Sequence, residues 1–462
     1  MFRKTNRRDF LKSSALAGTG FWVAERTLRA QNTSANEKLN IASIGAGGRA
    51  GGVVFDTVNQ CKDQVNIVAL CDVNDDRAGK TFEAFPQARR FHDYREMLEK
   101  MHKEIDAVIV GTPDHTHAPA AMMAMKLGKH VYCEKPLTHT VHEARLLAET
   151  AAKYKVATQM GNQGTSIDKF RESVEALRAG VIGPVREIYC WTNRPVWPQG
   201  IDAVMQHQGV RYALRGTDQP AQAPDAKLWD LWLGPAQFRP YDQIYVPFKW
   251  RGWWDFGTGA LGDMACHTAN LPYMGCDLGL PTSIVSEVSA DMNPESYPTW
   301  SIVDYDFPAR GDLLPVKYHW YDGGVHKPRK VTEKLSELLD GDEVPGSGCV
   351  IIGDKGKLIP SGDYGAGYEL RPAKNFEGYT PPAPSLPRSP GHQREWVEAC
   401  MGGPPALSNF AHAAKFTEMV LLGCVAIRVG QRIEYDGASG RITNLPDANQ
   451  YLTKEYRKGW EL

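Results

Sequence analysis

The chain has 462 residues, and its 53 Lys and Arg against 54 Asp and Glu give a formal net charge of −1, with 42% of residues hydrophobic. This length accommodates roughly two or three domains, and the balanced charge excludes the basic surface that a nucleic-acid-binding protein needs. The nine Cys residues stand singly, without C-x-x-C pairs or His at zinc spacing, so we expect neither a disulfide framework nor a structural metal.

Residues 1–38 predict an export signal and a linker. Arg7 and Arg8 open the string R-R-D-F-L-K, and a weakly apolar segment then runs to about residue 24, too short to span a bilayer. The pattern is typical of the twin-arginine export route, so we expect an exported, periplasmic protein without stable membrane insertion. A basic disordered arm is the alternative interpretation. An exported nicotinamide enzyme would have to hold its cofactor tightly and restore its redox state on the same molecule.

The segment 39–163 predicts a dinucleotide-binding domain. An apolar strand, 39–44, runs into a G-x-G-x-x-A turn. In such a turn the first Gly permits the sharp bend, the second lets backbone amides approach a pyrophosphate, and the small third residue lets helix and strand pack closely. The helix that follows directs its amino end at the phosphates. We therefore expect the cofactor to contact Gly45, Gly47, Gly48, Arg49 and Ala50.

The acid at the end of the second strand selects the nucleotide. Asp72 follows the apolar residues 66–71. A carboxylate at this point accepts hydrogen bonds from ribose hydroxyls and repels a 2′-phosphate, so NAD is favoured over NADP. Arg77 lies close in the sequence and keeps NADP open. The structural alternative for Asp72 is a cap on the next helix.

Strands and helices keep alternating up to residue 163. The expected elements are helices at 94–101, 118–126 and 140–153 and strands at 106–110, 129–133 and 156–160. This β-α-β series predicts a doubly wound parallel sheet. Its carboxyl edge should gather further cofactor-binding residues: Thr112, Pro113, His115, Glu134, Lys135, Asn162 and Gln163. The H-x-H string at 115–117 lacks a third ligand, so no metal site is predicted.

The string Y-C-E-K-P at 132–136 stands at the centre of this edge. Proline removes a backbone donor and biases the preceding residue towards extended geometry. Lys135 should therefore lie at the carboxyl end of a strand, where ligands of such sheets bind. A lysine fixed there can transfer a proton. A surface Lys-Pro turn is the alternative interpretation.

The remainder of the chain, 164–462, predicts a different architecture. The expected elements are a helix at 166–179, strands near 183–191, 285–290, 300–307, 315–321 and 349–352, and helices near 392–401 and 411–429. Regular β-α-β units give way here to longer strands and loops. We expect an α+β domain built on an open, largely antiparallel sheet.

A stretch rich in Gly and Trp, 249–267, supplies the second part of the expected site. Asp263 and His267 stand four apart, which places them on one helical face. A carboxylate beside an imidazole fixes its tautomer, which suits removal of a proton from a hydroxyl. A helix-start Asp with a packed His is the alternative. Aromatic rings can stack on sugar C–H faces, and the rings expected to contact substrate are Trp191, Trp253 and Trp254.

From residue 39 onward, these three motifs in this order and spacing resemble the glucose–fructose oxidoreductase / inositol dehydrogenase (Gfo/Idh/MocA) family. The resemblance implies an NAD(P)-binding Rossmann domain, an α+β domain whose sheet often makes oligomer contacts, and sugars or cyclitols as substrates. It implies that Lys135 contacts substrate and nicotinamide, and that Asp263 and His267 are the acid and histidine of the family, with His267 favoured as the base. The positive nicotinamide ring should lower the pKa of Lys135.

The function implied is oxidation of a ring hydroxyl of a sugar or glycoside by hydride transfer to tightly bound NAD, in a homo-oligomer. Two alternatives stay open. One is a redox-neutral glycosidase or epimerase that works through a transient keto-sugar, although in the glycosidase branch the E-K-P lysine is typically absent. The other is a non-catalytic, exported sugar-binding protein.

Overall fold

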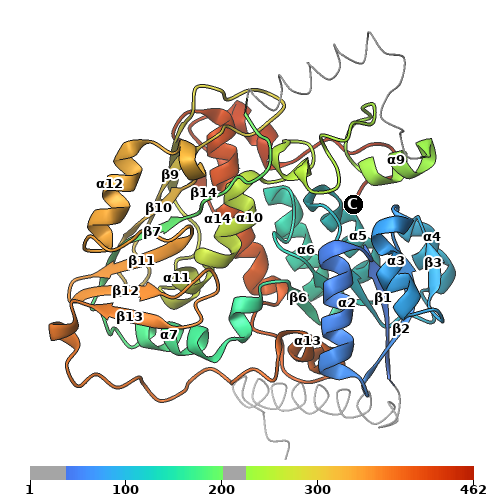
Figure 1. Ribbon diagram of the computed structural model, residues 1–462, viewed down its shortest axis with the longest axis horizontal. Coiled ribbons are helices and arrows are strands. Elements are labelled where there is room, and N and C mark those ends of the chain that lie inside the picture. Colours follow the sequence, from blue (N-terminus) through green and yellow to red (C-terminus); the bar gives the residue numbers. More distant parts are fainter. Residues whose placement is uncertain (1–37, 201–224) are drawn as a thin grey trace, which may run out of the picture.

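A computed structural model describes residues 38–200 and 225–462. The predicted export signal lies outside the described residues, apart from Lys38. Figure 1 shows two sheets side by side, one in the blue and teal part of the chain and one mainly in its orange part.

The amino-terminal part contains a six-stranded parallel sheet in the order β3-β2-β1-β4-β5-β6. Its strands are β1 (Leu39–Ile44), β2 (Val65–Cys71), β3 (Arg89–Phe91), β4 (Ala107–Val110), β5 (His130–Cys133) and β6 (Thr158–Met160). The helices between them are α2 (Gly48–Cys61), α3 (Asp75–Ala84), α4 (Tyr94–Met101), α5 (Asp114–Lys126) and α6 (Val141–Tyr154). The central strand β4 is apolar and buried throughout, because helices cover both faces of the sheet. The predicted Rossmann-type sheet is confirmed.

One helix begins earlier than predicted. α5 starts at Asp114, with Pro113 in extended geometry as the residue that precedes it. Proline presets the backbone before a helix, and an acid in the first turn is favoured by the helix dipole. As a result His115 and His117 lie within the helix and not in a loop.

The carboxyl-terminal part contains a nine-stranded sheet in the order β13-β12-β11-β7-β10-β9-β8-β14-β15. Its strands are β7 (Val185–Trp191), β8 (Ser283–Val288), β9 (Ser301–Phe307), β10 (Val316–Tyr321), β11 (Gly348–Gly353), β12 (Gly356–Pro360), β13 (Tyr368–Arg371), β14 (Ile433–Asp436) and β15 (Arg441–Ile442). All neighbours pair antiparallel except β7 and β10, which are parallel. The predicted α+β domain with a largely antiparallel sheet is confirmed.

Helices cover both faces of this second sheet. The helices in this part are α7 (Asp168–Arg178), α9 (Ala226–Leu233), α10 (Gly259–Thr268), α11 (Asn270–Gly275), α12 (Arg329–Leu338), α13 (His392–Cys400) and α14 (Phe410–Val429), and the short 3-10 helices are η1 (Gln163–Ser166), η2 (Lys249–Gly252), η3 (Gly324–His326), η4 (Ala373–Phe376) and η5 (Pro446–Leu452). α12 packs its Val331 and Leu335 against Tyr189 and Trp191 of β7. Part of the sheet that was expected to make oligomer contacts is therefore covered by the chain itself. An oligomer through this sheet stays a prediction.

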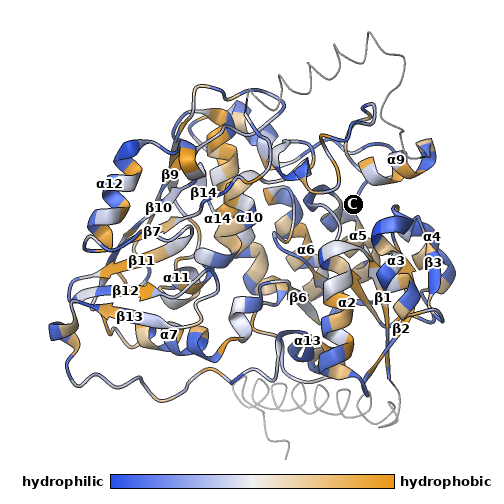
Figure 2. Ribbon diagram, in the orientation of Figure 1, coloured by the Kyte–Doolittle hydropathy of each residue, from blue (hydrophilic) through white to orange (hydrophobic). Residues whose placement is uncertain are grey.

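The long helix α14 joins the two parts. By length and composition alone this helix could cross a membrane. However, 83% of its apolar 18-residue stretch is buried inside the protein. It packs against α6 of the first part and against α10 and β8 of the second. Figure 2 shows it largely in the colours of apolar residues, between the two sheets. α14 is therefore a core helix.

The chain also returns to the nucleotide-binding part near its end. α13 packs against α2, and the amide of Met160 donates to the carbonyl of Ser408. One large core cluster contains residues of both parts, among them Val110 and Tyr318. This packing fixes α10, with Asp263 and His267, opposite the carboxyl ends of β4 and β5.

Candidate active site

The glycine turn after β1 is packed too closely against its neighbours for side chains at its glycine positions. Gly45 has φ +91°, and a Cβ there would lie 3.1 Å from the backbone of Gly111. A Cβ on Gly47 would lie 2.9 Å from Arg77. A Cβ on Gly111 would meet the Cβ of Ala50 at 2.6 Å, so helix α2 and the end of β4 touch. The glycines and the small Ala50 thus have the roles expected of a pyrophosphate-binding turn.

Asp72 faces this turn from the end of β2. Its Oδ2 accepts hydrogen bonds from the amides of Ala46 and Gly47 at 2.8 and 3.0 Å. The cap of α3 is Asn74, whose side chain accepts from the amide of Arg77. Asp72 is therefore not the cap of that helix, and its carboxylate lies against the turn that would hold the phosphates.

A cavity of about 580 Å³ opens along this edge of the sheet. Eight of the predicted cofactor residues line it: Gly45, Gly47, Arg49, Asp72, Thr112, Pro113, Glu134 and Lys135. The predicted residues that do not line it are Gly48, Ala50, His115, Asn162 and Gln163. The glycine turn, the acid on β2 and the amino end of α2 together line a cavity that fits a bound NAD.

His115 is one correction. It is 1% exposed, and its ring packs between Trp232 and Phe256 with centroids 5.3 and 5.2 Å away. Its Nε2 lies 3.1 Å from the carbonyl of Trp232. Burial holds the pKa of His115 well below its usual range. Because it lies in the first turn of α5 on the side that faces these aromatic rings, its role is packing.

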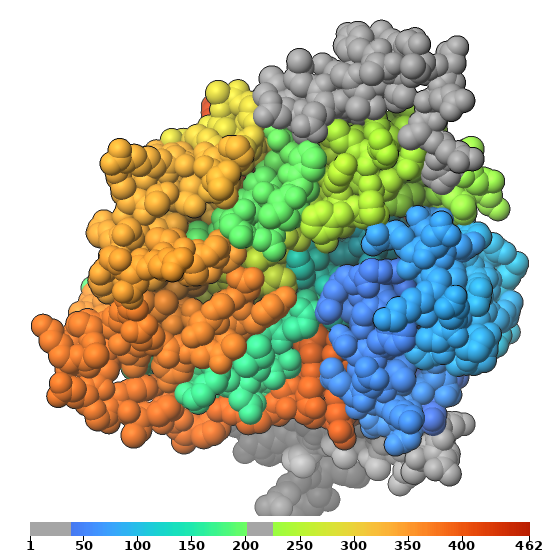
Figure 3. Space-filling view, in the orientation of Figure 1, coloured from blue at the N-terminus to red at the C-terminus, as the bar shows by residue number. Residues whose placement is uncertain are grey.

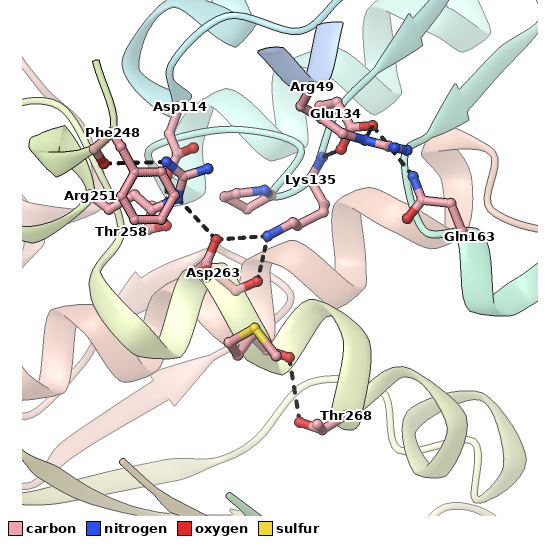
Figure 4. Close-up of polar contacts among 12 residues, drawn as sticks. Arg49, Asp114, Glu134, Lys135, Gln163, Phe248, Arg251, Thr258, Asp263 and Thr268 are labelled. Carbon is pink, nitrogen blue, oxygen red and sulfur yellow. Dashed lines mark hydrogen bonds and ion pairs between the residues drawn. The ribbon is translucent and has the colours of Figure 1, made fainter. Parts of the chain in front are cut away.

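Glu134 and Gln163 form a second polar group beside the cavity. Glu134 is 5% exposed and accepts from Nε of Arg49 at 2.9 Å and from the hydroxyl of Tyr132 at 3.2 Å. Nε2 of Gln163 lies 3.4 Å from the same carboxylate, as Figure 4 shows. A Cβ on Gly161 would stand 2.6 Å from this carboxyl group, so any larger residue there would have to displace Glu134. The buried carboxylate thus orients Arg49 at the amino end of α2.

The motif lysine and the motif aspartate meet although 128 residues separate them. Nζ of Lys135 donates to Oδ1 of Asp263 at 2.8 Å and to its backbone carbonyl at 2.7 Å. Nε of Arg251 also donates to this Oδ1, at 3.2 Å. Figure 4 shows both cations directed at one carboxylate. Lys135 is therefore fixed between the cavity, which it lines, and α10.

The charges of this cluster set its protonation states. Burial raises the pKa of Asp263, but Lys135 and Arg251 overcome this effect and hold that pKa well below its usual range. Burial lowers the pKa of Lys135, but the charge and the hydrogen bond of Asp263 outweigh it, so that pKa is raised. This direction is opposite to the one expected from the nicotinamide ring. Lys135 is a cation in this arrangement.

His267 follows one helical turn after Asp263 and is 8% exposed. Burial, and then the charge of Lys135, lowers its pKa to about 3, so the imidazole is neutral at ordinary pH. Within the described ranges, Asp263 and His267 share no hydrogen bond, and the buried Nδ1 of His267 has no partner. The expected carboxylate–imidazole pair is thus a correction: Asp263 holds Lys135 instead.

The three tryptophans expected to contact substrate are a further correction. Trp191 is 3% exposed beneath α12, and its Nε1 donates to the carbonyl of Pro345. Trp253 is fully buried, and Trp254 is 5% exposed with its ring 3.6 Å from that of Tyr297. All three pack inside the protein. The aromatic residues that line the cavity are Tyr94, Trp229, Trp232, Tyr241, Phe248, Trp250 and Trp460.

Several polar residues of the cavity were not predicted: Asn74, His92, Asp93, Asp114, Thr116 and Arg251. Arg251 lies among the tryptophans of the stretch 249–267, which also contains Asp263, and a cation among aromatic residues there was a usable signal. Asp114 is 4% exposed, lines the cavity and accepts from the hydroxyl of Thr258 at 2.7 Å. Burial raises its pKa. Its place directly after a strand end and Pro113 was the signal for it.

Comparison with known proteins identifies the family of both domains. Residues 39–162 match the Gfo/Idh/MocA "oxidoreductase family, NAD-binding Rossmann fold", and residues 197–312 match its "C-terminal alpha/beta domain". A glycosyl hydrolase family 109 protein of Solibacter usitatus is 34% identical over 197 residues, which is 39% of this chain and 44% of that protein. A myo-inositol 2-dehydrogenase of Thermotoga maritima is 27% identical over 172 residues, 37% of this chain and 50% of that protein.

The chain thus matches about half the length of these curated relatives. Among solved structures, the WlbA dehydrogenase from Bordetella pertussis, in complex with NADH and UDP-GlcNAcA, has a TM-score of 0.56 at 16% identity. That likeness covers 87% of this chain and 99% of WlbA, and it concerns the fold. With both domains matched and the motif residues gathered at one edge, the chain belongs to the Gfo/Idh/MocA oxidoreductase family and carries its NAD-binding Rossmann domain.

Proposed function

We propose that this protein is an NAD-dependent oxidoreductase that oxidises a ring hydroxyl of a sugar or glycoside. The observation that carries the proposal is the Lys135 ammonium, held by Asp263 at 2.8 Å where the NAD cavity meets α10. The name of the Thermotoga relative, a myo-inositol 2-dehydrogenase, supports a cyclic polyol or sugar as substrate. A cavity with several aromatic walls and convergent polar groups suits such a ligand.

The residues that would hold NAD are those of the glycine turn, with Asp72 at the ribose and Arg49 near the phosphates. When bound, NAD accepts a hydride from a carbinol carbon. The chain has to supply the rest, which is to bind the hydroxyl on that carbon and to remove its proton. Both tasks fall to groups beside Lys135.

Lys135 and His267 divide these tasks. The Lys135 ammonium donates hydrogen bonds, and as a cation it stabilises the negative charge that develops on the substrate oxygen. The neutral imidazole of His267, with its pKa lowered to about 3, has a ring nitrogen free of a proton. His267 is the general base that the family resemblance implies; because a base works best when its pKa lies near the working pH, bound substrate would have to raise the pKa of His267 for this role. Asp263 keeps the ammonium in place, and Arg251 binds the same carboxylate.

A redox-neutral glycosidase is a second candidate. The observation that favours it is the match at 34% identity to a protein named as glycosyl hydrolase family 109. In such a cycle the sugar would be oxidised to a transient ketone, which makes loss of the neighbouring glycosidic group easier. The same nucleotide would then return its hydride to the ketone. Lys135 in E-K-P favours dehydrogenation over this alternative.

One experiment separates the two candidates. Protein purified with its nucleotide is mixed with a panel of glycosides, and absorbance in the reduced nicotinamide band is followed together with release of the aglycone. A dehydrogenase gives a rise in absorbance without aglycone. Aglycone release without an added electron acceptor and without lasting reduction would favour the glycosidase. No response with any sugar or cyclitol would overturn the proposal.

We also propose that the protein is exported by the twin-arginine route. The support is the string R-R-D-F-L-K at 7–12. Fractionation of cells that produce the full chain should find it outside the cytoplasm, and replacing Arg7 and Arg8 by Lys should keep it inside. Unchanged location in that double variant would contradict export by this route.

A further inference from the structure

One wall of the NAD cavity comes from two segments outside the Rossmann domain. Leu228 and Leu231 of α9 line it, and so does Trp460. The same cavity is lined by Asp72 and Asn74, which belong to the adenosine end of a Rossmann site. Figure 1 places α9 beside α4, and Figure 3 shows the yellow-green part of the chain lying directly against the blue part.

Residues 453–462 are here called the strap. We propose that the strap and α9 together close over the adenosine half of NAD and retain the cofactor between turnovers. The inference rests on the NAD-binding domain and does not depend on which sugar is oxidised.

The strap is tied to α9 by a single arginine. The guanidinium of Arg457 forms an ion pair with Asp230 and donates to its carbonyl at 2.8 Å. Its Nε donates to the carbonyl of Gly234 at 2.9 Å, just after the end of α9. The backbone amide of Arg457 donates to the carbonyl of Pro235. A planar guanidinium that makes several bonds in one plane holds its partners in a fixed orientation.

The strap is also tied to the Rossmann domain. Nζ of Lys454 forms an ion pair with Glu143 at 2.8 Å and donates to the carbonyl of His115 at 2.9 Å. The hydroxyl of Tyr456 donates to Glu143 at 2.8 Å. Glu143 is fully buried and also caps α6. A buried carboxylate that loses its partners is costly, so this anchor resists opening.

The tip of the strap is fixed on α4. Trp460 is 5% exposed, with its ring 5.9 Å from that of Tyr94, which also lines the cavity. The guanidinium of Arg95 lies 3.8 Å above the Trp460 ring and donates to the carbonyl of Gly459 at 3.0 Å. The strap thus has anchors on α4, α5, α6 and α9.

These anchors determine how the cofactor leaves. A nucleotide under this wall can dissociate only when the strap or α9 moves away. The closed wall therefore slows release of the nucleotide. When variants of one binding site differ in affinity, the difference lies mainly in the dissociation rate. A cofactor that stays bound is what an enzyme needs when it restores its redox state on the same molecule.

The test is the dissociation rate of NADH from the full chain. Protein loaded with NADH is mixed with excess NAD, and the loss of bound-NADH fluorescence is timed without any sugar. In Arg457→Ala and in Trp460→Ala we expect release at least about tenfold faster than in the wild type. Arg432→Ala is the matched control, because its bonds to Ser283 and Asp306 lie on the second sheet and touch no cavity residue; its rate should not change.

Two outcomes overturn the inference. One is a rate within about twofold of the wild type in both variants, when circular dichroism shows both to be folded. The other is an equal acceleration by Arg432→Ala, which would mean that general loosening is measured. If Arg457→Ala does not fold, Tyr456→Phe takes its place, because it removes one hydrogen bond to Glu143 and no charge. Failure of these tests leaves the sugar oxidation proposal untouched, since no substrate is present.

Discussion

At the scale of single residues, the site depends on one carboxylate shared by two cations. Oδ1 of Asp263 accepts from both Lys135 and Arg251. Asp263 raises the pKa of Lys135, while the charge of Arg251 opposes that rise. Arg251 therefore balances the carboxylate and limits how firmly Lys135 keeps its proton.

This balance predicts the behaviour of Arg251→Met. Without the opposing charge, the pKa of Lys135 rises further, so the loss of kcat/KM on the alkaline side moves to higher pH. The rate itself should fall roughly tenfold, because one charged hydrogen bond is lost. Arg251→Lys keeps the charge and should leave the alkaline limb near its wild-type position. A pH–rate profile of Arg251→Met with an unmoved limb would show that the two cations are not coupled.

Among the predicted site residues, those with strong local constraints line the cavity, whereas the places of the others depend on packing. The glycines, Asp72 and Lys135 follow strands and have few alternative positions. The Lys135–Asp263 contact joins residues that are 128 positions apart and was not predicted, since helical periodicity pointed to a pair of Asp263 with His267 instead. The prediction for the three tryptophans was wrong because a Trp in the core and a Trp in a cavity wall look alike in the sequence. Arg251 was not predicted because no motif of the sequence contains it.

At the scale of elements, Gly161 at the end of β6 controls the Glu134 group. A methyl group there would stand 2.6 Å from the carboxyl carbon and 2.7 Å from its oxygens. Gly161→Ala should push Glu134 away from Arg49 and cost about 1–3 kcal/mol of unfolding free energy. NAD affinity should fall with it, because Arg49 loses its orientation. Urea unfolding and nucleotide titration measure both effects.

Gly79 on α3 is the matched control for this change. A Cβ at Gly79 would meet nothing within 4 Å, and the residue lies in a helix. Gly79→Ala should therefore be neutral or stabilising by up to about 1 kcal/mol. Equal behaviour of the two variants would rule out the steric account of Gly161.

Elements were predictable where apolar runs are long, and less so elsewhere. β1 and β4 were found because buried parallel strands are continuous apolar runs. β3 was missed, since its sequence R-R-F has only three residues at the sheet edge. The order of the second sheet, with β7 between β10 and β11, rests on pairings between distant strands that no local pattern encodes.

At the scale of the whole molecule, buried neutral histidines make stability depend on pH. Burial lowers the pKa of His267 and His392 to about 3 and that of His412 to about 4, from 6.5. Below pH 6.5 the unfolded chain binds protons on these rings and the folded chain does not. Stability is therefore fully present above that pH and is lost as the pH falls towards the folded values.

This linkage predicts a fall in Tm of at least about 5 °C between about pH 7 and about pH 5. His392→Asn should flatten this dependence, because one of the buried rings is removed. His142→Asn, at an exposed position on α6, should leave it as it is. Calorimetry of the three proteins across this range is the check, and a Tm independent of pH in the wild type would contradict it.

The most direct test of the proposed chemistry compares wild type with Lys135→Met after both are purified with their nucleotide. On addition of an accepted glycoside, the wild type should show a rise in reduced nicotinamide absorbance. The variant should carry the same amount of NAD and show a rate at least about 10²-fold lower, while Lys126→Met, at an exposed site on α5, behaves as wild type. An unchanged rate in Lys135→Met with full NAD content would contradict the assignment of the chemistry to this lysine.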